Sequence, residues 1–204
     1  MSYKLTYFDV PGLAEPIRFL MAYLDIDFED NRIGYQTWSA VKPSMPFGKV
    51  PILEIDGQVL NQSSAITRYL ARKAGLAGID DWESMLIDIA VDNVHDFRHE
   101  IAVYVFTERK NCDAESNSSK IKEITKFYME KFESIVTINK GFFVNGKLTW
   151  ADLFFVAISD TLSDMAKIDI LEGRPNLQTL KTQVLSIPQI KTWVAKRPEP
   201  SVLF

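Results

Sequence analysis

The sequence of 204 residues contains only one cysteine and two histidines. A single cysteine, Cys112, cannot form an intrachain disulfide, and the low counts exclude zinc ribbons and CxxC redox sites. Apolar runs such as residues 153–158 are far shorter than the roughly 20 residues that cross a bilayer. A Gly-rich phosphate-binding loop is missing as well. We therefore expect a protein without a metal site or a membrane span, in which Cys112 is incidental.

Basic residues are not in excess, because 23 Lys and Arg stand against 27 Asp and Glu, for a formal net charge of -4. This balance removes the electrostatic basis for sequence-independent binding to nucleic acids. The composition, 47% apolar and 25% charged, is that of an ordinary soluble globular protein. The first residues lack the apolar segment of a signal peptide, so we expect a cytoplasmic location.

The chain changes character near residue 74. Residues 1–74 contain eight basic and eight acidic residues, whereas the remainder contains fifteen and nineteen. The first part alternates short β-rich runs with helical patterns, and the second shows only helical periodicity. We predict an α/β domain at residues 1–74, a linker at 75–81 and an all-α helical bundle at 82–204.

The first part predicts a small mixed sheet with helices packed on it. Strands are expected at residues 5–8, 28–33, 52–55 and 59–60, and helices at 13–24 and 63–74. Asp56-Gly57 is a strong hairpin signal between the last two strands. Gly75 is well placed as the left-handed cap of the second helix.

The second part predicts helices at residues 82–106, 120–138, 177–185 and 189–195, and one beginning at Thr149. Thr149 and Asp152 form a capping-box pattern, a specific signal for a helix start. The polar stretch 111–119 is expected to interrupt the helical pattern. The first helix is expected to bury one stripe, made of Trp82, Leu86, Ile89, Phe97, Ile101 and Tyr104.

Several short motifs follow one another at compatible spacing along the whole chain. They are Tyr7 at the end of the first strand, Trp38 in a loop, Phe47-Gly48-Lys49-Val50-Pro51, Gln62-Ser63-Ser64-Ala65-Ile66 and Leu148-Thr149-Trp150-Ala151-Asp152. With these motifs the chain resembles cytosolic glutathione S-transferases of the sigma class. The resemblance implies a thioredoxin-like amino-terminal domain that binds glutathione, an all-α carboxy-terminal domain that adds the electrophile pocket and the dimer interface, and a homodimer.

Tyr7 falls at the catalytic position of the family, where a phenol donates a hydrogen bond to the sulfur of glutathione. A thiol with a pKa of about 8.5 is a few per cent ionised at pH 7, and lowering that pKa by about 2 units raises the thiolate fraction roughly 25-fold. One charge-assisted hydrogen bond, at roughly 1.5–3 kcal/mol, nearly supplies such a shift. From the residues alone, Tyr7 is better explained as a strand aromatic packed against the sheet, and it is the resemblance that favours the catalytic role.

The resemblance also implies the residues that hold glutathione. The bond between Val50 and Pro51 is expected to be cis, so that the backbone of Val50 pairs with the cysteinyl unit like an added strand. Ser63 at a helix amino terminus suits the γ-glutamyl carboxylate, and Gln62 adds an amide contact. Without the family, an ordinary strand-opening proline and a helix-capping serine explain the same residues.

The glycyl end of glutathione is assigned to the segment before the third strand. Trp38 and Lys42 address its carboxylate by an indole N–H and an ammonium group, while Gly48 and Lys49 bring the backbone close to the ligand. A loop tryptophan that plugs the core and lysines that are merely solvated remain the alternatives. Phe8 and Leu13 are expected to wall the electrophile pocket.

Asp88, Asp92 and Asp96 share one face of the long helix. The family implies that Asp96 of the partner subunit reaches the ammonium group of glutathione. In the related haematopoietic prostaglandin D synthases a carboxylate cluster here binds a divalent ion, but its middle member is His95 in this chain, and no metal is expected. Leu13 replaces an arginine of those synthases.

The expected activity is conjugation of glutathione, as co-substrate, to hydrophobic electrophiles, with a possible peroxidase side activity. Two alternatives stay open. One is a glutathione-dependent prostaglandin isomerase, against which the replacement at Leu13 counts. The other is a non-catalytic structural or ligand-carrier protein, although such a protein has no need to keep Tyr7, Trp38 and the Val50-Pro51 motif together.

Overall fold

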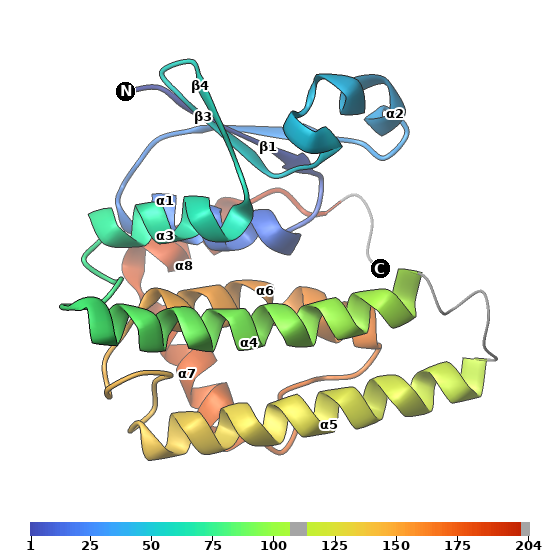
Figure 1. Cartoon of the computed structure of the whole chain (residues 1–204), viewed down its shortest axis with the longest axis vertical. Helices are drawn as coiled ribbons and strands as arrows, with labels where there is room; N and C mark the ends of the chain where they lie inside the picture. The colour runs from blue at the N-terminus through green and yellow to red at the C-terminus, as the bar shows by residue number, and fades with distance from the viewer. Residues whose placement is uncertain (107–113, 201–204) are drawn as a thin grey trace. The chain divides into compact units, whose positions relative to one another are not determined.

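The computed structural model describes residues 1–106 and 114–200. They form two compact units, one made of Met1–Ala77 together with residues 185–200, the other of the described residues within Gly78–Val184. The first is a small α/β unit and the second is helical (Figure 1), which confirms the predicted fold class. The domain limits at residues 74 and 82 stay a prediction. Cys112 lies outside the described residues.

The first unit contains one four-stranded sheet with the order β2-β1-β3-β4. The central strand β1 pairs in parallel with β2 and antiparallel with β3, and β3 pairs antiparallel with β4. The four strands are β1 (Tyr3–Phe8), β2 (Glu29–Ile33), β3 (Ile52–Ile55) and β4 (Gln58–Asn61). Asp56 and Gly57, with φ of 47° and 83°, form the predicted hairpin turn between β3 and β4.

Three helices pack in the first unit: α1 (Glu15–Tyr23), α3 (Ser63–Lys73) and α8 (Pro188–Lys196). Helix α1 contacts both others, and Figure 1 shows α1 and α3 below the sheet. Helix α1 begins at Glu15 rather than at Leu13, because residues 12–14 form a short 3-10 turn. Helix α3 ends as predicted, with Gly75 at φ 70° just beyond it.

A long connection between β2 and β3 carries only short helical pieces. These are α2 (Trp38–Val41) and two 3-10 turns, η2 (Lys42–Ser44) and η3 (Pro46–Gly48). Two of the three pieces have proline at their first or second position, where a fixed φ favours a turn and the missing N–H is not needed.

The second unit is built from α4 (Asp81–Phe106), α5 (Ala114–Ile138), α6 (Trp150–Ala166) and α7 (Pro175–Ser186). Helix α6 is buried along nearly its whole length and packs against α4. Its amino terminus has the predicted capping box: the Asp152 carboxylate accepts the Thr149 N–H at 2.6 Å and the Phe143 N–H at 2.8 Å. Burial raises the pKa of Asp152 to about 6, although these hydrogen bonds act to lower it.

The structure corrects two expectations about the helical unit. Helix α5 begins at Ala114, within the stretch expected to interrupt the helices. The predicted core stripe of α4 is wrong in its first half, because Trp82 is 68% exposed and Ile89 is 49% exposed. The buried face of α4 is instead formed by Ile87, Ala90, Val91, Val94, Phe97 and Ile101. Among the described residues, no helix is long and apolar enough to cross a membrane.

Candidate functional site

Tyr7 lies at the end of β1, where the chain turns toward α1. Its side chain is 7% exposed, and its hydroxyl oxygen accepts a hydrogen bond from the backbone N–H of Leu13 at 3.3 Å. The nitrogen is the donor in this bond, and a phenol can in addition act as a hydrogen-bond donor itself. Accepting one bond also strengthens the bond that a hydroxyl donates, by about 10–30%.

Gly12 allows the backbone to come this close to Tyr7. Its φ is +46°, and a Cβ atom built on it would lie 2.8 Å from the Tyr7 hydroxyl oxygen. A side chain at this position would therefore displace either the loop or the phenol.

An aromatic cluster surrounds Phe8, the residue after Tyr7. The ring of Phe8 stacks on Tyr35, with centroids 4.7 Å apart, and meets Trp38 edge-on at 5.1 Å. Trp38 is half-buried at the start of α2, so it does not plug the core. Burial raises the pKa of Tyr35, and the neighbouring Tyr7 adds to the effect. Phe8 and Leu13 are both half-buried next to Tyr7, as walls of a pocket beside its hydroxyl would be.

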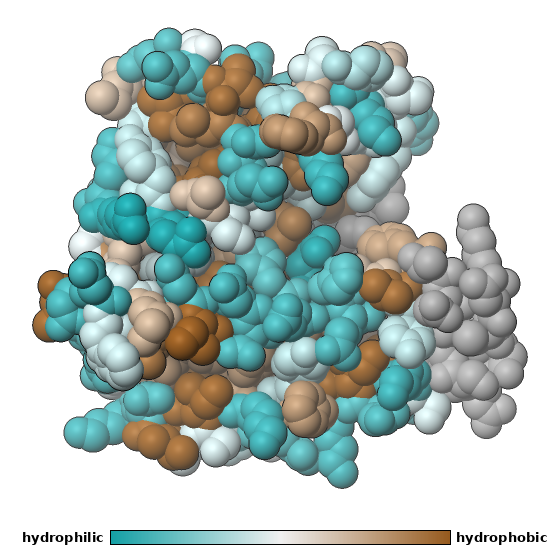
Figure 2. Space-filling view, in the orientation of Figure 1, coloured by the Kyte–Doolittle hydropathy of each residue, from teal (hydrophilic) through white to brown (hydrophobic). Residues whose placement is uncertain are grey.

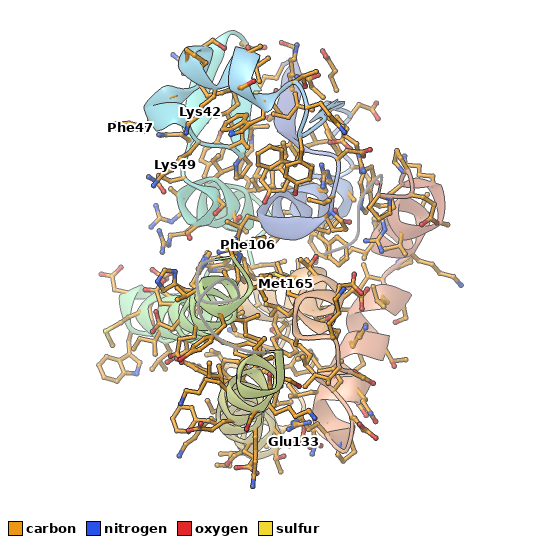
Figure 3. All side chains as sticks on the ribbon, turned by 90° about the vertical axis from the view of Figure 1, so that its right-hand side faces the viewer. Lys42, Phe47, Lys49, Phe106, Glu133 and Met165 are labelled. Atoms are coloured by element: carbon orange, nitrogen blue, oxygen red, sulfur yellow. The ribbon has the colours of Figure 1, made fainter. Side chains whose placement is uncertain are left out.

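Two exposed lysines flank the turn before β3. Lys42 and Lys49 lie on the same side of the first unit, with Phe47, which is 87% exposed, between them in the sequence (Figure 3). Gly48 has φ +59°, and a Cβ atom there would lie 3.2 Å from Cε of Lys42. The glycine thus lets the lysine side chain run across the backbone.

The Val50–Pro51 peptide bond is cis. Pro51 is buried, whereas Val50 is half-buried. The pairing of β3 with both of its neighbours begins at Ile52, the residue after Pro51. The backbone of Val50 therefore lies just outside the sheet, where an extended peptide can add to it.

The amino terminus of α3 is the third part of the site. Ser63 is the first helical residue and is buried, while Gln62 occupies the N-cap position without a side-chain capping bond. Gln62 has φ 73° and ψ 100°, a combination that residues other than glycine rarely adopt. The first hydrogen bond of the helix runs from Ile66 N–H to the Gln62 carbonyl, so the amides before it can face an anion.

The predicted site residues therefore fall into two groups. One group belongs to the first unit and is expected to contact glutathione bound to the same subunit. Its residues lie at the end of β1, in the stretch from α2 to β3 and at the start of α3. They are Tyr7, Trp38, Lys42, Gly48, Lys49, Val50, Pro51, Gln62 and Ser63. Asp96, expected to act across the dimer, is exposed on α4 of the second unit.

His95, next to Asp96 on α4, packs its ring on Phe154 at 4.6 Å. Burial, followed by the charge of Arg98, lowers the pKa of His95 and so favours the neutral ring. Within the part of the chain that the structure describes, no group of three or more His, Cys, Asp or Glu side chains is placed to hold a metal ion.

Sequence reasoning missed two contributors to this site. The backbone N–H of Leu13 has no signature in the sequence, because every residue except proline carries one. Tyr35 had a detectable signal, since it is an aromatic residue only three positions before Trp38.

Comparisons with known proteins give a consistent result. Residues 3–72 match the family model "Glutathione S-transferase, N-terminal domain", and residues 95–197 match "Glutathione S-transferase, C-terminal domain". A glutathione S-transferase of Anopheles gambiae is 43% identical, over 97% of both chains. The haematopoietic prostaglandin D synthase of Gallus gallus is 39% identical, over 98% of this chain and 99% of its own. The solved structure of prostaglandin synthase D of Nilaparvata lugens has a TM-score of 0.90 at 40% identity, over 98% of this chain and 100% of its own.

Proposed function

The chain belongs to the glutathione S-transferase family, and from this premise we propose that it binds glutathione as a thiolate at Tyr7 and conjugates it to hydrophobic electrophiles. The observation that carries the proposal is the geometry of Tyr7. Its buried hydroxyl lies at the end of β1, held by the N–H of Leu13, and a phenol can donate its hydrogen to a sulfur anion.

The mechanism is control of the thiol pKa. A hydrogen bond from the phenol stabilises the thiolate but not the thiol, so the thiol ionises at lower pH. The thiolate then attacks a soft electrophilic carbon, and the enzyme contributes orientation of the two reactants. Phe8 and Leu13 supply the apolar wall against which the electrophile packs. Unsaturated aldehydes and aromatic halides are suitable substrates, and lipid hydroperoxides are substrates for a peroxidase side activity.

The proposed binding mode uses each charge of the tripeptide. The Val50 backbone pairs with the cysteinyl unit, and Lys42 with the indole N–H of Trp38 binds the glycyl carboxylate. The γ-glutamyl carboxylate lies at the start of α3, against Ser63 and Gln62. Gly48 and Lys49 complete the rim next to the glycyl end. Asp96 of the partner subunit binds the ammonium group.

The main test replaces the phenol while keeping its ring. In Tyr7→Phe, we expect the pKa of the bound glutathione thiol to rise by about 2 units and conjugation of a halogenated arene at pH 6.5 to fall on the order of 100-fold. Tyr23→Phe is the matched control, since it removes a phenol of the first unit, at the end of α1, that does not belong to this aromatic cluster and should leave both quantities nearly unchanged. A wild-type complex whose thiol titrates like free glutathione would refute the mechanism.

We also propose a homodimer. Helix α4 exposes Trp82 (68%), Met85 (42%) and Ile89 (49%). In the first unit, apolar side chains gather over the β3–β4 hairpin (Figure 2), around a hollow of about 700 Å³ lined by Val59 and Tyr69. Clusters of exposed apolar side chains are typical of the surfaces through which subunits contact each other. A sedimentation mass near the 23.3 kDa of a single chain at micromolar concentration would contradict the dimer and the role of Asp96.

A glutathione-dependent prostaglandin isomerase is the second candidate, because prostaglandin D synthases are among the relatives at 39% identity. Leu13 offers no charge to a prostaglandin carboxylate. Incubation with prostaglandin H₂ and glutathione tests this activity, and formation of prostaglandin D₂ no faster than without enzyme rejects it. No metal is required for either reaction proposed.

We propose a cytoplasmic location for this enzyme. Glutathione maintains reduced thiols in the cytosol, so the co-substrate is present there as the free thiol that the reaction consumes.

A further inference from the structure

Helix α1 buries two opposite charges, which the activity above does not use. Glu15 and Arg18 are both fully buried, and Arg18 Nη1 donates to Glu15 Oε2 at 3.0 Å. They stand three residues apart in a helix that is otherwise apolar on its buried side. Burying such a pair costs desolvation energy, and it persists only when further hydrogen bonds satisfy both groups.

Helix α8 supplies some of these hydrogen bonds. The indole N–H of Trp193 donates to Glu15 Oε1 at 2.8 Å, and Arg197 Nη1 donates to the same oxygen at 2.8 Å. The Trp193 ring is 7% exposed and lies 5.5 Å from the ring of Phe28. A segment nearly 180 residues downstream in sequence thus holds the carboxylate of Glu15 from one side.

The loop next to Tyr7 supplies the others. Besides Glu15, Arg18 Nη1 donates to the carbonyl oxygens of Val10 at 3.2 Å and Pro11 at 3.3 Å. These two residues directly precede Gly12 and Leu13, whose backbone encloses the Tyr7 hydroxyl. A continuous series of polar contacts therefore runs from α8 through Glu15 and Arg18 to the loop that supports the phenol.

The remaining edge of the Arg18 guanidinium is fixed by β2. Its Nε donates to Asp30 Oδ1 at 3.0 Å, whereas Nη2 lies at the same distance from that oxygen without a hydrogen bond. Asp30 Oδ2 accepts Arg32 Nε at 2.8 Å. Arg32 in turn pairs with Asp9 at 3.1 Å. Because hydrogen bonds hold both Nη1 and Nε, the guanidinium has little freedom to turn with the loop, and the loop takes the position that Arg18 sets.

We propose that Trp193 of α8 and Arg197, the C-cap residue that directly follows this helix, are positioning residues of the thiol-activating site, acting through Glu15 and Arg18 on the backbone of residues 10–13. The inference rests on the proposed function. The Leu13–Tyr7 bond, at 3.3 Å, is longer than a typical N–H···O bond of about 2.9–3.0 Å. A small retreat of the loop therefore breaks it, and a misplacement of about 1 Å at a reacting group can cost about 100-fold in rate.

The test compares α8 variants in the intact enzyme. Trp193→Phe removes the N–H donor and keeps most of the ring, and Arg197→Met removes the charge. Lys196→Met is the matched control, because it removes a neighbouring exposed cation at the end of the same helix and leaves both donors to Glu15 in place. The probes are glutathione and a halogenated arene, and the measurements are the pKa of the bound thiol, kcat, the KM for glutathione and the midpoint of thermal unfolding.

We expect the bound thiol's pKa to rise by about 0.5 units in Trp193→Phe and in Arg197→Met, which lowers kcat below pH 6 roughly threefold. The KM for glutathione should change by less than about twofold, because the residues that hold its two carboxylates lie elsewhere. Arg197→Lys should restore part of the loss, and Lys196→Met should behave as wild type.

The outcomes separate two failures. In the first case, the wild-type enzyme lowers the thiol pKa and both variants keep that lowered pKa, even if their unfolding midpoints fall. The role of α8 is then only structural, and this inference is overturned while the proposed function stands. If Trp193→Phe does not fold, Arg197→Met, which is at the partly exposed end of the contact series, decides by the same criterion. If the wild-type thiol titrates like free glutathione, the proposed function fails and the inference fails with it.

Discussion

Replacing Gly12 by alanine tests the geometry around Tyr7 most directly. A Cβ atom at Gly12 would lie 2.8 Å from the Tyr7 hydroxyl oxygen, 2.9 Å from Cε1 and 3.2 Å from Cζ. Favourable contacts between such atoms begin at about 3.5 Å. The phenol and the loop must therefore separate by about 0.7 Å, and Tyr7 has little room to do so because it is 7% exposed.

The substitution has two costs, which act on different properties. Alanine at φ +46° is in the left-handed region, which costs roughly 1–2 kcal/mol of folding free energy. The separation also lengthens the Leu13–Tyr7 hydrogen bond, now 3.3 Å, beyond its useful range. Since a misplacement of about 1 Å can cost about 100-fold, we expect kcat/KM to fall on the order of 10-fold or more.

Gly57→Ala provides the control for the backbone cost. Gly57 has φ +83°, yet apart from its own two chain neighbours no atom of the described residues lies within 4 Å of the position that a Cβ atom would take there. Both variants should lose about 1–2 kcal/mol in urea unfolding, whereas only Gly12→Ala should lose conjugation activity and the lowered thiol pKa. Full activity in a folded Gly12→Ala protein would refute the argument that the loop positions the phenol.

Three further predictions concern other parts of the chain. Gln62→Ala and Gln62→Gly should raise the KM for glutathione equally. The glycine variant should be about 1 kcal/mol more stable, because alanine keeps a Cβ atom at φ 73°. Equal stabilities would show that the backbone of residue 62 is not strained. Trp38→Phe should raise that KM roughly 3- to 10-fold by loss of one N–H donor while thermal stability changes little; an unchanged KM would remove Trp38 from the site. Hydrogen bonds from Asn145 and then Lys147 lower the pKa of Glu83, so its stabilising effect is present above about pH 4.5 and is lost as the pH falls through the lowered pKa. Unfolding free energy between pH 5 and 3 should therefore fall less steeply in Glu83→Gln, and parallel curves would reject this.

Elements with a local signal were predictable from the sequence. The β3–β4 hairpin follows from Asp56-Gly57, and the start of α6 follows from Thr149 and Asp152, because turn and capping residues act within a few positions of themselves. The cis bond before Pro51 was expected from the family resemblance rather than from local chemistry.

The buried face of α4 could not be read in the same way. Apolar residues occur around most of its first half, so Trp82, Leu86 and Ile89 form one periodic stripe and Ile87, Val91 and Val94 form another. Both stripes have helical spacing, so periodicity alone does not show which of them faces the core of the chain and which stays exposed. The exposed stripe is the one we assign to the proposed dimer.

The same distinction between local and distant information applies to the candidate site. Residue types identify Tyr7, Trp38 and Ser63, whereas the contacts that place the phenol come from backbone groups and from α8. One signal for the distant part was nevertheless present in the sequence. Glu15 and Arg18 interrupt an apolar helix three residues apart, and two buried charges require donors and acceptors beyond each other. A charged pair in a predicted core helix therefore indicates that another segment must reach it, even when the sequence cannot say that the segment is α8.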